Sequence, residues 1–304
     1  MNHHLLRNGY SMSVSGYLDK LEVTVLAEDS VLYESPLWGQ HGVSFLLEAY
    51  KDGVKRNVLV DVAQSSEALL HNMRLLGVNP STIDAVILTH CHYDHTQGLA
   101  EILKAVGRRD LPVIAHPDIF RLNFVVEPYL RHVGVMSGDS RERIEESGGT
   151  LYLTRDPLQI MPGLVTTGEV KRQTDFEEVG IPLKTITRDG RVVEDRMVDD
   201  TSVIANIGNK GIVIITGCSH AGIVNIVKHS IELTGIKKIK AIIGGLHLIE
   251  APTERIKKTV EALSKYDIDL ISAGHCTGFE AQVELYKTFG ERFLPLHTGM
   301  KFTF

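Results

Sequence analysis

Four potential metal ligands lie within six positions of one another, between a predicted strand and a predicted helix. The chain reads Thr-His-Cys-His-Tyr-Asp-His over residues 89–95. The four groups are His90, His92, Asp94 and His95. Residues 85–88 form a short apolar run typical of a buried strand, and residues 98–106 have the pattern of a helix. Loops that follow such strands often carry the chemistry of α/β folds, so we expect an α/β fold with its site here.

This cluster predicts metal binding. Neutral imidazole nitrogens and carboxylate oxygens suit zinc, and iron and manganese accept the same ligands. The alternating His90 and His92 can point into one site, while the adjacent Asp94 and His95 can turn toward a second. The spacing therefore predicts two divalent metal ions, with zinc first and iron or manganese as alternatives. A solvated histidine-rich loop without metal would not account for the apolar strand directly before it.

Hydrophobic periodicity predicts strands and helices in both halves of the chain. Strands are predicted at residues 21–27, 43–49, 58–62, 85–88, 202–207, 211–216, 239–243, 270–272 and 292–297. Helices are predicted at residues 65–76, 98–106, 221–234, 253–265 and 280–289. Strands with intervening helices, twice over, indicate two mixed β-sheets packed face to face with helices outside.

The His-x-His-x-Asp-His run resembles the signature of the metallo-β-lactamase superfamily. Asp61, at the end of an apolar strand, stands where that superfamily has a buried supporting aspartate. Later stretches resemble the branch that includes the dihydropterin-methyl-ribofuranosylaminobenzene phosphate synthases of methanopterin biosynthesis. They are Thr-Gly-Glu-Val at 167–170, Thr-Gly-Cys-Ser-His-Ala-Gly-Ile at 216–223, Gly-Gly-Leu-His-Leu at 244–248 and Gly-His-Cys-Thr-Gly at 274–278. The resemblance spans residues 23–302 and implies an αβ/βα four-layer sandwich, as a single domain over residues 1–304.

We expect His220 and His275, each after a predicted strand, to complete the ligand set. The first metal would be held by His90, His92 and His220, and the second by Asp94, His95 and His275. Asp61 would orient a ligand histidine, and Asp94 would also accept a proton during catalysis. One element of the resemblance is missing. Where the superfamily has the histidine of its third motif, the chain reads Asp-Asp-Thr-Ser over residues 199–202.

Two further residues beside the predicted ligands have alternative interpretations. Cys218 ends a strand where relatives outside this branch often carry a bridging aspartate. We interpret it as a small buried filler, and the alternative is a thiolate that ligates or supports the metal. His247 also ends a strand and is interpreted as a supporting or substrate-facing histidine. An odd number of cysteines, three, argues against a disulfide framework. No pattern surrounds His41, His71, His132, His229 or His297, and His116 is a weaker candidate at the rim.

Residues 119–173 are rich in charge and glycine and have poor periodicity. We interpret them as an inserted lid over the metal site, with a solvated excursion as the alternative. Arg131 in this segment and Glu169 near its end are candidates for contact with substrate. Residues 1–20 are predicted to be a flexible leader.

Composition excludes several classes of protein. A formal net charge of −6 argues against general nucleic-acid affinity, which usually needs a basic face. No apolar run reaches the length of a membrane span, and residues 1–10 do not form a secretory signal. We therefore expect a cytoplasmic enzyme with a small-molecule substrate, no nucleic-acid partner and no membrane association. The oligomeric state cannot be derived from this pattern.

Three functions remain open. The first is a metal-dependent hydrolase whose two metals activate water against a small phosphorylated or ester substrate. The second, implied by the resemblance, is a transferase that joins a dihydropterin methyl diphosphate to an aryl ribofuranosyl phosphate and releases diphosphate. A basic, aromatic pocket would favour it, formed by Tyr129, Arg131, Arg141 and Phe176. The third is a non-enzymatic metal-binding sensor, which an incomplete second metal site would favour.

Overall fold

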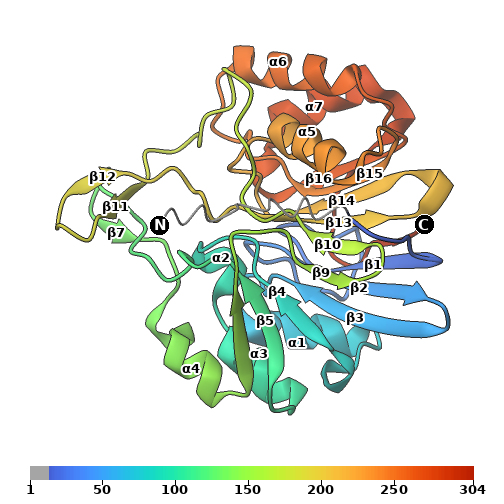
Figure 1. Ribbon diagram of the computed structural model, residues 1–304. Coiled ribbons are helices and arrows are strands. Elements are labelled where there is room, and N and C mark those ends of the chain that lie inside the picture. The colour runs from blue at the N-terminus through green and yellow to red at the C-terminus, as the bar shows by residue number, and fades with distance from the viewer. Residues whose placement is uncertain (1–13) are drawn as a thin grey trace, which may run out of the picture.

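Two seven-stranded β-sheets pack face to face in the computed structural model, which describes residues 14–304 (Figure 1). The first sheet contains β1 (Lys20–Ala27), β2 (Ser44–Lys51), β3 (Val54–Val60), β4 (Ala85–Ile87), β5 (Leu111–Ala115), β8 (Gly149–Leu153) and β18 (Lys301–Thr303), in the order β18-β1-β2-β3-β4-β5-β8. The second contains β9 (Gln159–Met161), β10 (Leu164–Thr166), β13 (Ser202–Asn206), β14 (Ile212–Thr216), β15 (Ile239–Gly245), β16 (Ile271–Gly274) and β17 (Phe293–Pro295), in the order β17-β16-β15-β14-β13-β10-β9.

Amphipathic helices cover the outer face of each sheet (Figure 1). The first sheet is covered by α1 (Ser66–Leu75), α3 (Leu99–Val106) and α4 (Arg141–Glu146), and the second by α5 (Ile223–Thr234), α6 (Thr253–Ser264) and α7 (Phe279–Phe289). Local sequence sets their ends: Ser65 Oγ accepts from Ala68 N–H at the start of α1, and Gly107 and Gly235 end α3 and α5 in the left-handed conformation. The predicted αβ/βα four-layer sandwich is confirmed.

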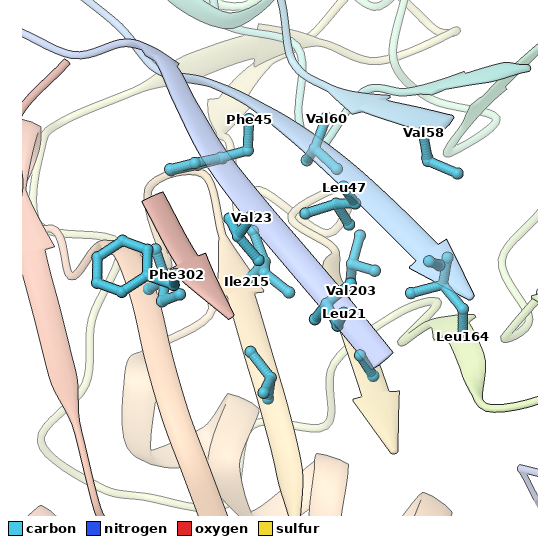
Figure 2. Packing of buried hydrophobic residues seen from close by; sticks show 14 of the residues in the cluster. Leu21, Val23, Phe45, Leu47, Val58, Val60, Leu164, Val203, Ile215 and Phe302 are labelled. Atoms are coloured by element: carbon cyan, nitrogen blue, oxygen red, sulfur yellow. The ribbon is translucent and has the colours of Figure 1, made fainter. Parts of the chain in front are cut away.

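The central core lies between the two sheets, as Figure 2 shows. Side chains such as Leu21, Val23 and Phe45 of the first sheet meet Val203 and Ile215 of the second, and all five are fully buried. Residues of a strand alternate between its two faces, so each sheet buries one face in this core and the other beneath its helices.

A third, four-stranded sheet extends to one side of the sandwich, at the left of Figure 1. It contains β6 (Phe124–Val125), β7 (Arg131–His132), β11 (Lys184–Ile186) and β12 (Val192–Glu194), in the order β12-β11-β6-β7. The bounds of the predicted lid, 119–173, do not match it: β8 belongs to the first sheet, β9 and β10 belong to the second, and β11 and β12 come later in the chain. Strands of two or three residues are too short to show a period, so the sequence did not predict this sheet.

The predicted leader is only partly described. Residues 1–13 lie outside the described residues. The remainder is fixed to the second sheet rather than flexible. Leu18 N–H donates to Asn206 O at 2.8 Å, and Ser15 O accepts from Gly163 N–H at 2.9 Å. Among the described helices, none combines the length and the apolar character needed to cross a bilayer.

Candidate metal centre

Loops that follow parallel strands of both sheets meet at one edge of the sandwich. In the first sheet β3 and β4 are parallel, and the loop with the histidine cluster follows β4. In the second sheet β14, β15 and β16 are parallel, and a histidine lies at or just after the end of each. A Cβ atom at Gly217 would lie 2.2 Å from Thr89 Oγ1 and 2.9 Å from Asp61 Oδ2. Only glycine fits at position 217, which brings the two sheets into close contact here.

His90, His92 and His220 form what we call the histidine triad. His92 Nδ1 lies 3.2 Å from both His90 Nε2 and His220 Nε2, and all three side chains are buried. The opposite ring nitrogens of the first two have neutral partners. His90 Nδ1 lies 3.0 Å from Thr89 Oγ1, and His92 Nε2 lies 3.1 Å from Asn123 Oδ1. These partners turn one nitrogen of each ring toward the centre of the triad.

The triad is uncharged at neutral pH. Burial lowers the pKa of His90, His92 and His220, and neighbouring imidazoles act in the same direction. For His92, burial outweighs the nearby carboxylate of Asp94, and the pKa is lowered to about 4. Neutral imidazole is the form that binds metal ions, so the triad needs no deprotonation to act as a ligand set.

Asp94, His95, His275 and Cys218 form a second set of donors, which we call the acidic group. Cys218 Sγ lies 3.1 Å from His95 Nε2 and 3.4 Å from His275 Nε2. Asp94 Oδ2 lies 3.3 Å and 3.2 Å from the same two nitrogens. All four donor atoms lie within 4.8 Å of one another, and all four side chains are buried. The structure therefore brings together the residues predicted for the second metal, together with the Cys218 thiol.

A carboxylate stands behind each imidazole of the acidic group. Asp61 Oδ2 lies 2.8 Å from His95 Nδ1, and Asp29 Oδ1 lies 2.9 Å from His275 Nδ1. Burial alone would lower the pKa of His95, but the charges of Asp94 and Asp61 outweigh it and raise the pKa to about 9. Because the carboxylates engage the Nδ1 atoms, both Nε2 atoms face the other donors.

Cys218 and His247 connect the two sets. Together with His220 they form a further group of donor atoms within 4.8 Å of one another. The ring centroids of His247 and His220 are 4.0 Å apart, and His247 Nδ1 is buried without a partner among the described residues. The sulfur of Cys218 faces the imidazoles of the acidic group.

Several residues of the site have strained backbones. Asp61, Ser219, His247 and His275 adopt φ values of 55°, 67°, 47° and 50°, which non-glycine residues rarely do. Such conformations cost about 1–3 kcal/mol each and persist where the surrounding structure holds them, often at functional sites. The packing at this edge of the sandwich therefore imposes the positions of these side chains.

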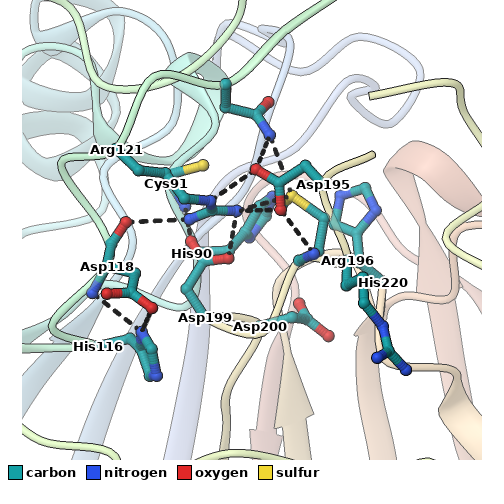
Figure 3. Close-up of polar contacts among 12 residues, drawn as sticks. His90, Cys91, His116, Asp118, Arg121, Asp195, Arg196, Asp199, Asp200 and His220 are labelled. Atoms are coloured by element: carbon teal, nitrogen blue, oxygen red, sulfur yellow. Dashed lines mark hydrogen bonds and ion pairs between the residues drawn. The ribbon is translucent and has the colours of Figure 1, made fainter. Parts of the chain in front are cut away.

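An ionic network supports the loop that carries the triad (Figure 3). Arg121 Nε donates to Asp195 Oδ2 at 2.6 Å, and Arg121 Nη2 lies 2.7 Å from Asp199 Oδ1. Asp199 Oδ2 accepts from the backbone N–H of Cys91 at 2.8 Å. Asn123, which also contacts the triad, donates to Asp195 at 2.8 Å. The motif around Asp199 thus holds the histidine loop in place.

Asp200 lies next to the triad without joining it. Its Oδ2 accepts from Ala221 N–H at 2.8 Å, and its Oδ1 is buried without a partner among the described residues. Burial raises the pKa of Asp200 to about 7, and the charge of Asp199 adds to the effect. The third imidazole, which residues 199–202 do not supply, comes from His220 in the loop after β14.

A cavity of about 280 Å³ is lined in part by Arg172, Arg196, Glu169 and Asp200, and by Ala221, the residue after His220. Arg172 donates from Nη1 to His220 O at 3.0 Å and from Nη2 to Arg196 O at 2.7 Å. Within the described part of the chain, neither arginine forms an ion pair with a carboxylate. The cavity is therefore lined by groups of both charges, with the carboxyl groups of Glu169 and Asp200 beside the two guanidinium groups.

The residues predicted to contact substrate lie in two separate parts of the structure. Glu169 stands at the rim of the 280 Å³ cavity, where it is 2.8 Å from His116 Nε2 and also pairs with Arg155. Arg131 is exposed and lines a separate hollow of about 770 Å³ together with Tyr93.

The predicted basic, aromatic pocket is not formed by its four residues. Tyr129 is exposed, Arg141 lies over the ring of Phe120, and Phe176 packs against the apolar cluster of the second sheet. Charge and aromatic content along one segment do not determine which side chains face each other.

Two residues of the site were missed. Asp29 supports His275, and His41 Nε2 lies 3.5 Å from Asp94 Oδ2. His41 is exposed, so it stands at the mouth of the site. Both belong to the irregular connection between β1 and β2, and the only sequence signal is an acidic pair directly after β1.

Comparisons with known proteins identify the family of the chain. The family model described as the metallo-beta-lactamase superfamily matches residues 38–182. The chain is 43% identical to the 7,8-dihydropterin-6-methyl-4-(β-D-ribofuranosyl)-aminobenzene-5′-phosphate synthase of Methanocaldococcus jannaschii, over 93% of this chain and 97% of that protein. It is 32% identical to an uncharacterised protein of the same organism, over 84% of this chain and 91% of that protein.

Solved structures share the fold. A metal-dependent hydrolase of the β-lactamase superfamily, Tm1679, superposes with a TM-score of 0.76 at 24% identity, over 93% of this chain and 98% of that one. The metallo-β-lactamase fold protein YhfI from Bacillus subtilis has a TM-score of 0.53 at 16% identity, over 94% of this chain and 100% of that one. The extent of the sequence identity and the shared architecture lead to one assignment: this chain belongs to the metallo-β-lactamase superfamily, in the branch that includes the archaeal dihydropterin-methyl-ribofuranosylaminobenzene phosphate synthase.

Proposed function

We propose that this site holds two divalent metal ions, with zinc as the expected metal. The first would be held by His90, His92 and His220, and the second by Asp94, His95 and His275. The fit rests on the chemistry of the donors. His92 Nδ1 lies 3.2 Å from both His90 Nε2 and His220 Nε2, and three buried imidazoles that converge in this way offer the nitrogen donors that a divalent cation binds.

We further propose that the chain is a transferase that makes a dihydropterin-methyl-ribofuranosylaminobenzene phosphate. The observation that carries this proposal is the 43% identity to the synthase of that name, which extends over 97% of the relative's length. In the proposed reaction the C–O bond between the pterin methylene and its diphosphate breaks. A C–N bond forms between that carbon and the arylamine, the nitrogen loses one proton, and diphosphate leaves.

The side chains at the site have distinct proposed tasks. When bound, the metals would offset the charge that develops on the leaving diphosphate. Arg172 and Arg196 line the adjoining cavity and would bind a phosphate of either substrate. The charge of His95 and a hydrogen bond from His275 outweigh burial and lower the pKa of Asp94, so Asp94 suits a ligand better than the predicted proton acceptor. The exposed His41 beside it is better placed to take the proton of the amine.

Hydrolysis is the second candidate. It is favoured by the dispersal of Tyr129, Arg131, Arg141 and Phe176, because no basic, aromatic pocket forms from them to bind an aromatic acceptor. The same pair of metals would then activate a water molecule against a phosphorylated or ester substrate. The sensor hypothesis has less support, since the acidic group offers four donor atoms and is not an incomplete site.

The deciding experiment measures diphosphate released from hydroxymethyl-dihydropterin diphosphate by metal-loaded protein, with and without the aryl ribofuranosyl phosphate. Release that requires the acceptor, together with formation of the joined product, supports the transferase. Release without the acceptor supports the hydrolase. If neither occurs, the pterin proposal is wrong, and phosphodiesters and esters become the substrates to test.

A further inference from the structure

A hollow of about 770 Å³ lies between the third sheet and the first sheet, next to the loop that carries the histidine cluster. One wall comes from the segment 131–136, which begins with β7, and the other from residues 64–67 around the start of α1. Tyr93, which stands between the predicted ligands His92 and Asp94, also lines it. Pockets of about 300–1,000 Å³ hold small organic ligands. The hollow therefore has the size of a substrate site and adjoins the proposed metal centre.

Hydrogen bonds connect both walls of the hollow to the surroundings of the metal centre. Tyr93 N–H donates to Val133 O at 3.0 Å, and Val133 N–H donates to Asn123 O at 2.9 Å. The side chain of Asn123 also contacts the histidine triad. In the other wall, Ser65 N–H donates to Gln40 Oε1 at 2.7 Å, and Gln40 Nε2 donates to Ser65 O at 3.3 Å. The position of each wall relative to the metal centre is therefore fixed.

His41, the residue after Gln40, stands where the hollow meets the mouth of the metal centre. Its ring centroid is 6.2 Å from that of Tyr93 and 5.1 Å from that of His275. Its Nε2 lies 3.5 Å from Asp94 Oδ2. A ligand that contacts Tyr93 from within the hollow can therefore place its reacting end beside His41, the residue proposed to take the proton of the amine.

The groups that line the hollow suit a ligand with an aromatic ring, hydroxyl groups and a phosphate. Tyr93 offers an aromatic ring for stacking. The side-chain amides of Gln64 and Gln97 form no hydrogen bond to another described residue, and amides both donate to and accept from hydroxyl groups. Arg131 is exposed and forms no ion pair within residues 14–304, not even with Glu67, the carboxylate in the lining. Its guanidinium is therefore available to a phosphate, whose geometry it matches well.

The cavity of about 280 Å³ that Arg172 and Arg196 line is less suited to such a ligand. Its volume is below the usual range for ligand pockets, and it carries Glu169 and Asp200 beside its arginines. The larger hollow is therefore the better place for a ligand with all three parts.

We propose that this hollow binds the arylamine substrate, with the aromatic ring against Tyr93 and the phosphate at Arg131. The ribose hydroxyls would contact Gln64 and Gln97. The inference rests on the transferase proposed above and deepens it by naming where the second substrate lies. In this orientation the amine points toward His41 and the metal centre, and the phosphate points toward the third sheet. The arginines of the 280 Å³ cavity then remain for the diphosphate of the other substrate.

The test measures binding to the metal-loaded full chain by calorimetry, without the pterin substrate. The probes are the aryl ribofuranosyl phosphate and the same compound without its phosphate. Arg131→Gln should lower the affinity for the phosphorylated probe by about tenfold or more, the usual effect of losing a hydrogen bond to a charged group. Its affinity for the dephosphorylated probe should stay unchanged, and Arg131→Lys should recover part of the loss. Arg191→Gln, at the opposite edge of the third sheet, is the matched control and should bind both probes as the wild type does.

A second variant tests the aromatic contact. Tyr93→Leu should lower the affinity for both probes by the same factor, roughly two- to tenfold, because the ring is common to both. The metal content of each variant is measured, so that a loss of metal is not taken for a loss of contact. In turnover, Arg131→Gln should raise the KM for the arylamine and leave kcat and the KM for the pterin substrate unchanged.

The outcomes separate this inference from the proposed function. If the wild type catalyses the transfer and Arg131→Gln binds the phosphorylated probe equally well, the inference is wrong and the transferase stands. If binding depends on Arg131 but no transfer occurs, the inference stands and the transferase is wrong. A wild-type protein that neither binds the arylamine nor catalyses the transfer would overturn both.

Discussion

The histidine triad and the acidic group sit side by side, yet they hold their imidazoles in opposite ways. His90 and His92 of the triad are oriented by neutral oxygens of Thr89 and Asn123. His95 and His275 of the acidic group are oriented by the carboxylates Asp61 and Asp29. The pKa values of the triad are lowered by burial, whereas nearby acidic groups raise those of His95 and His275 despite burial.

The difference determines whether each proposed metal must displace protons in order to bind. The triad is neutral at physiological pH, so a metal can bind there without displacing a proton. In the acidic group, imidazolium and carboxylate already compensate one another, and a metal must expel protons to enter. The two proposed sites should therefore fill in order, the triad first in acid and both near neutrality and above.

The largest effect is expected from removing a triad ligand. His92→Ala should lower turnover by roughly a thousandfold or more, because loss of a ligand should exceed the roughly 10–100-fold effect of losing a supporting partner. Far-ultraviolet circular dichroism should stay unchanged. His71→Ala, in which a histidine stacked on Trp38 is removed, is the matched control and should keep full activity. Full activity in His92→Ala would remove the triad from the mechanism.

Metal uptake should show the contrast directly. His95 has a pKa raised to about 9, so it is protonated below that pH and a metal must displace its proton. Affinity for the second metal should therefore rise about tenfold per pH unit up to about pH 9 for each proton displaced. Affinity for the first should be nearly flat above about pH 5, since the pKa of His92 is about 4. Chelator competition at several pH values measures both; parallel slopes would contradict the comparison.

A supporting carboxylate gives a smaller effect that is confined to one site. Asp29→Asn should lower the affinity of the second proposed site for metal by about tenfold, because the amide is a poorer acceptor for His275 Nδ1–H. The first metal should bind as before. Asp52→Asn changes an aspartate in a distant surface turn and serves as control. An equal loss of affinity at both proposed sites would mean that the two donor sets are not independent.

The last prediction concerns the stability of the metal-free protein and not its affinity for metal. The folded-state pKa of Asp200 is raised to about 7, above the ordinary value of 3.8. Stability from its protonated form is therefore present below about pH 4 and is lost as pH rises toward 7, by at most roughly 1.4 kcal/mol per pH unit. Asp200→Asn should melt higher than the wild type by a margin that grows between pH 5 and 7. A margin independent of pH would show that the pKa of Asp200 is not raised in the folded protein.

Residues inside motifs were predictable, and their neighbours in space were not. His90, His92, Asp94 and His95 are close in sequence, and the edge where parallel strands end is where His220 and His275 were expected. Asp29 and His41 carry no local pattern, since only the fold brings the connection after β1 against the loop after β16.

The same distinction applies to the fold. The eight-residue β1 and the continuous apolar run of β14 are recognisable in the sequence and mark the two sheets. The strands of the third sheet have two or three residues, and burial of their side chains depends on partners far along the chain. Sequence periodicity therefore predicted the sandwich and did not predict the third sheet.

Position 217 has a consequence for how the molecule is assembled. The absence of a side chain there lets the end of β14 rest against Thr89 and Asp61, and the donors of each proposed metal come from both halves of the chain. Neither half can hold either ion alone. A bound metal would cross-link the two sheets, so the sheets could separate only after the metal is released. Metal loading should then slow the unfolding of the whole chain and protect amide hydrogens in both sheets equally.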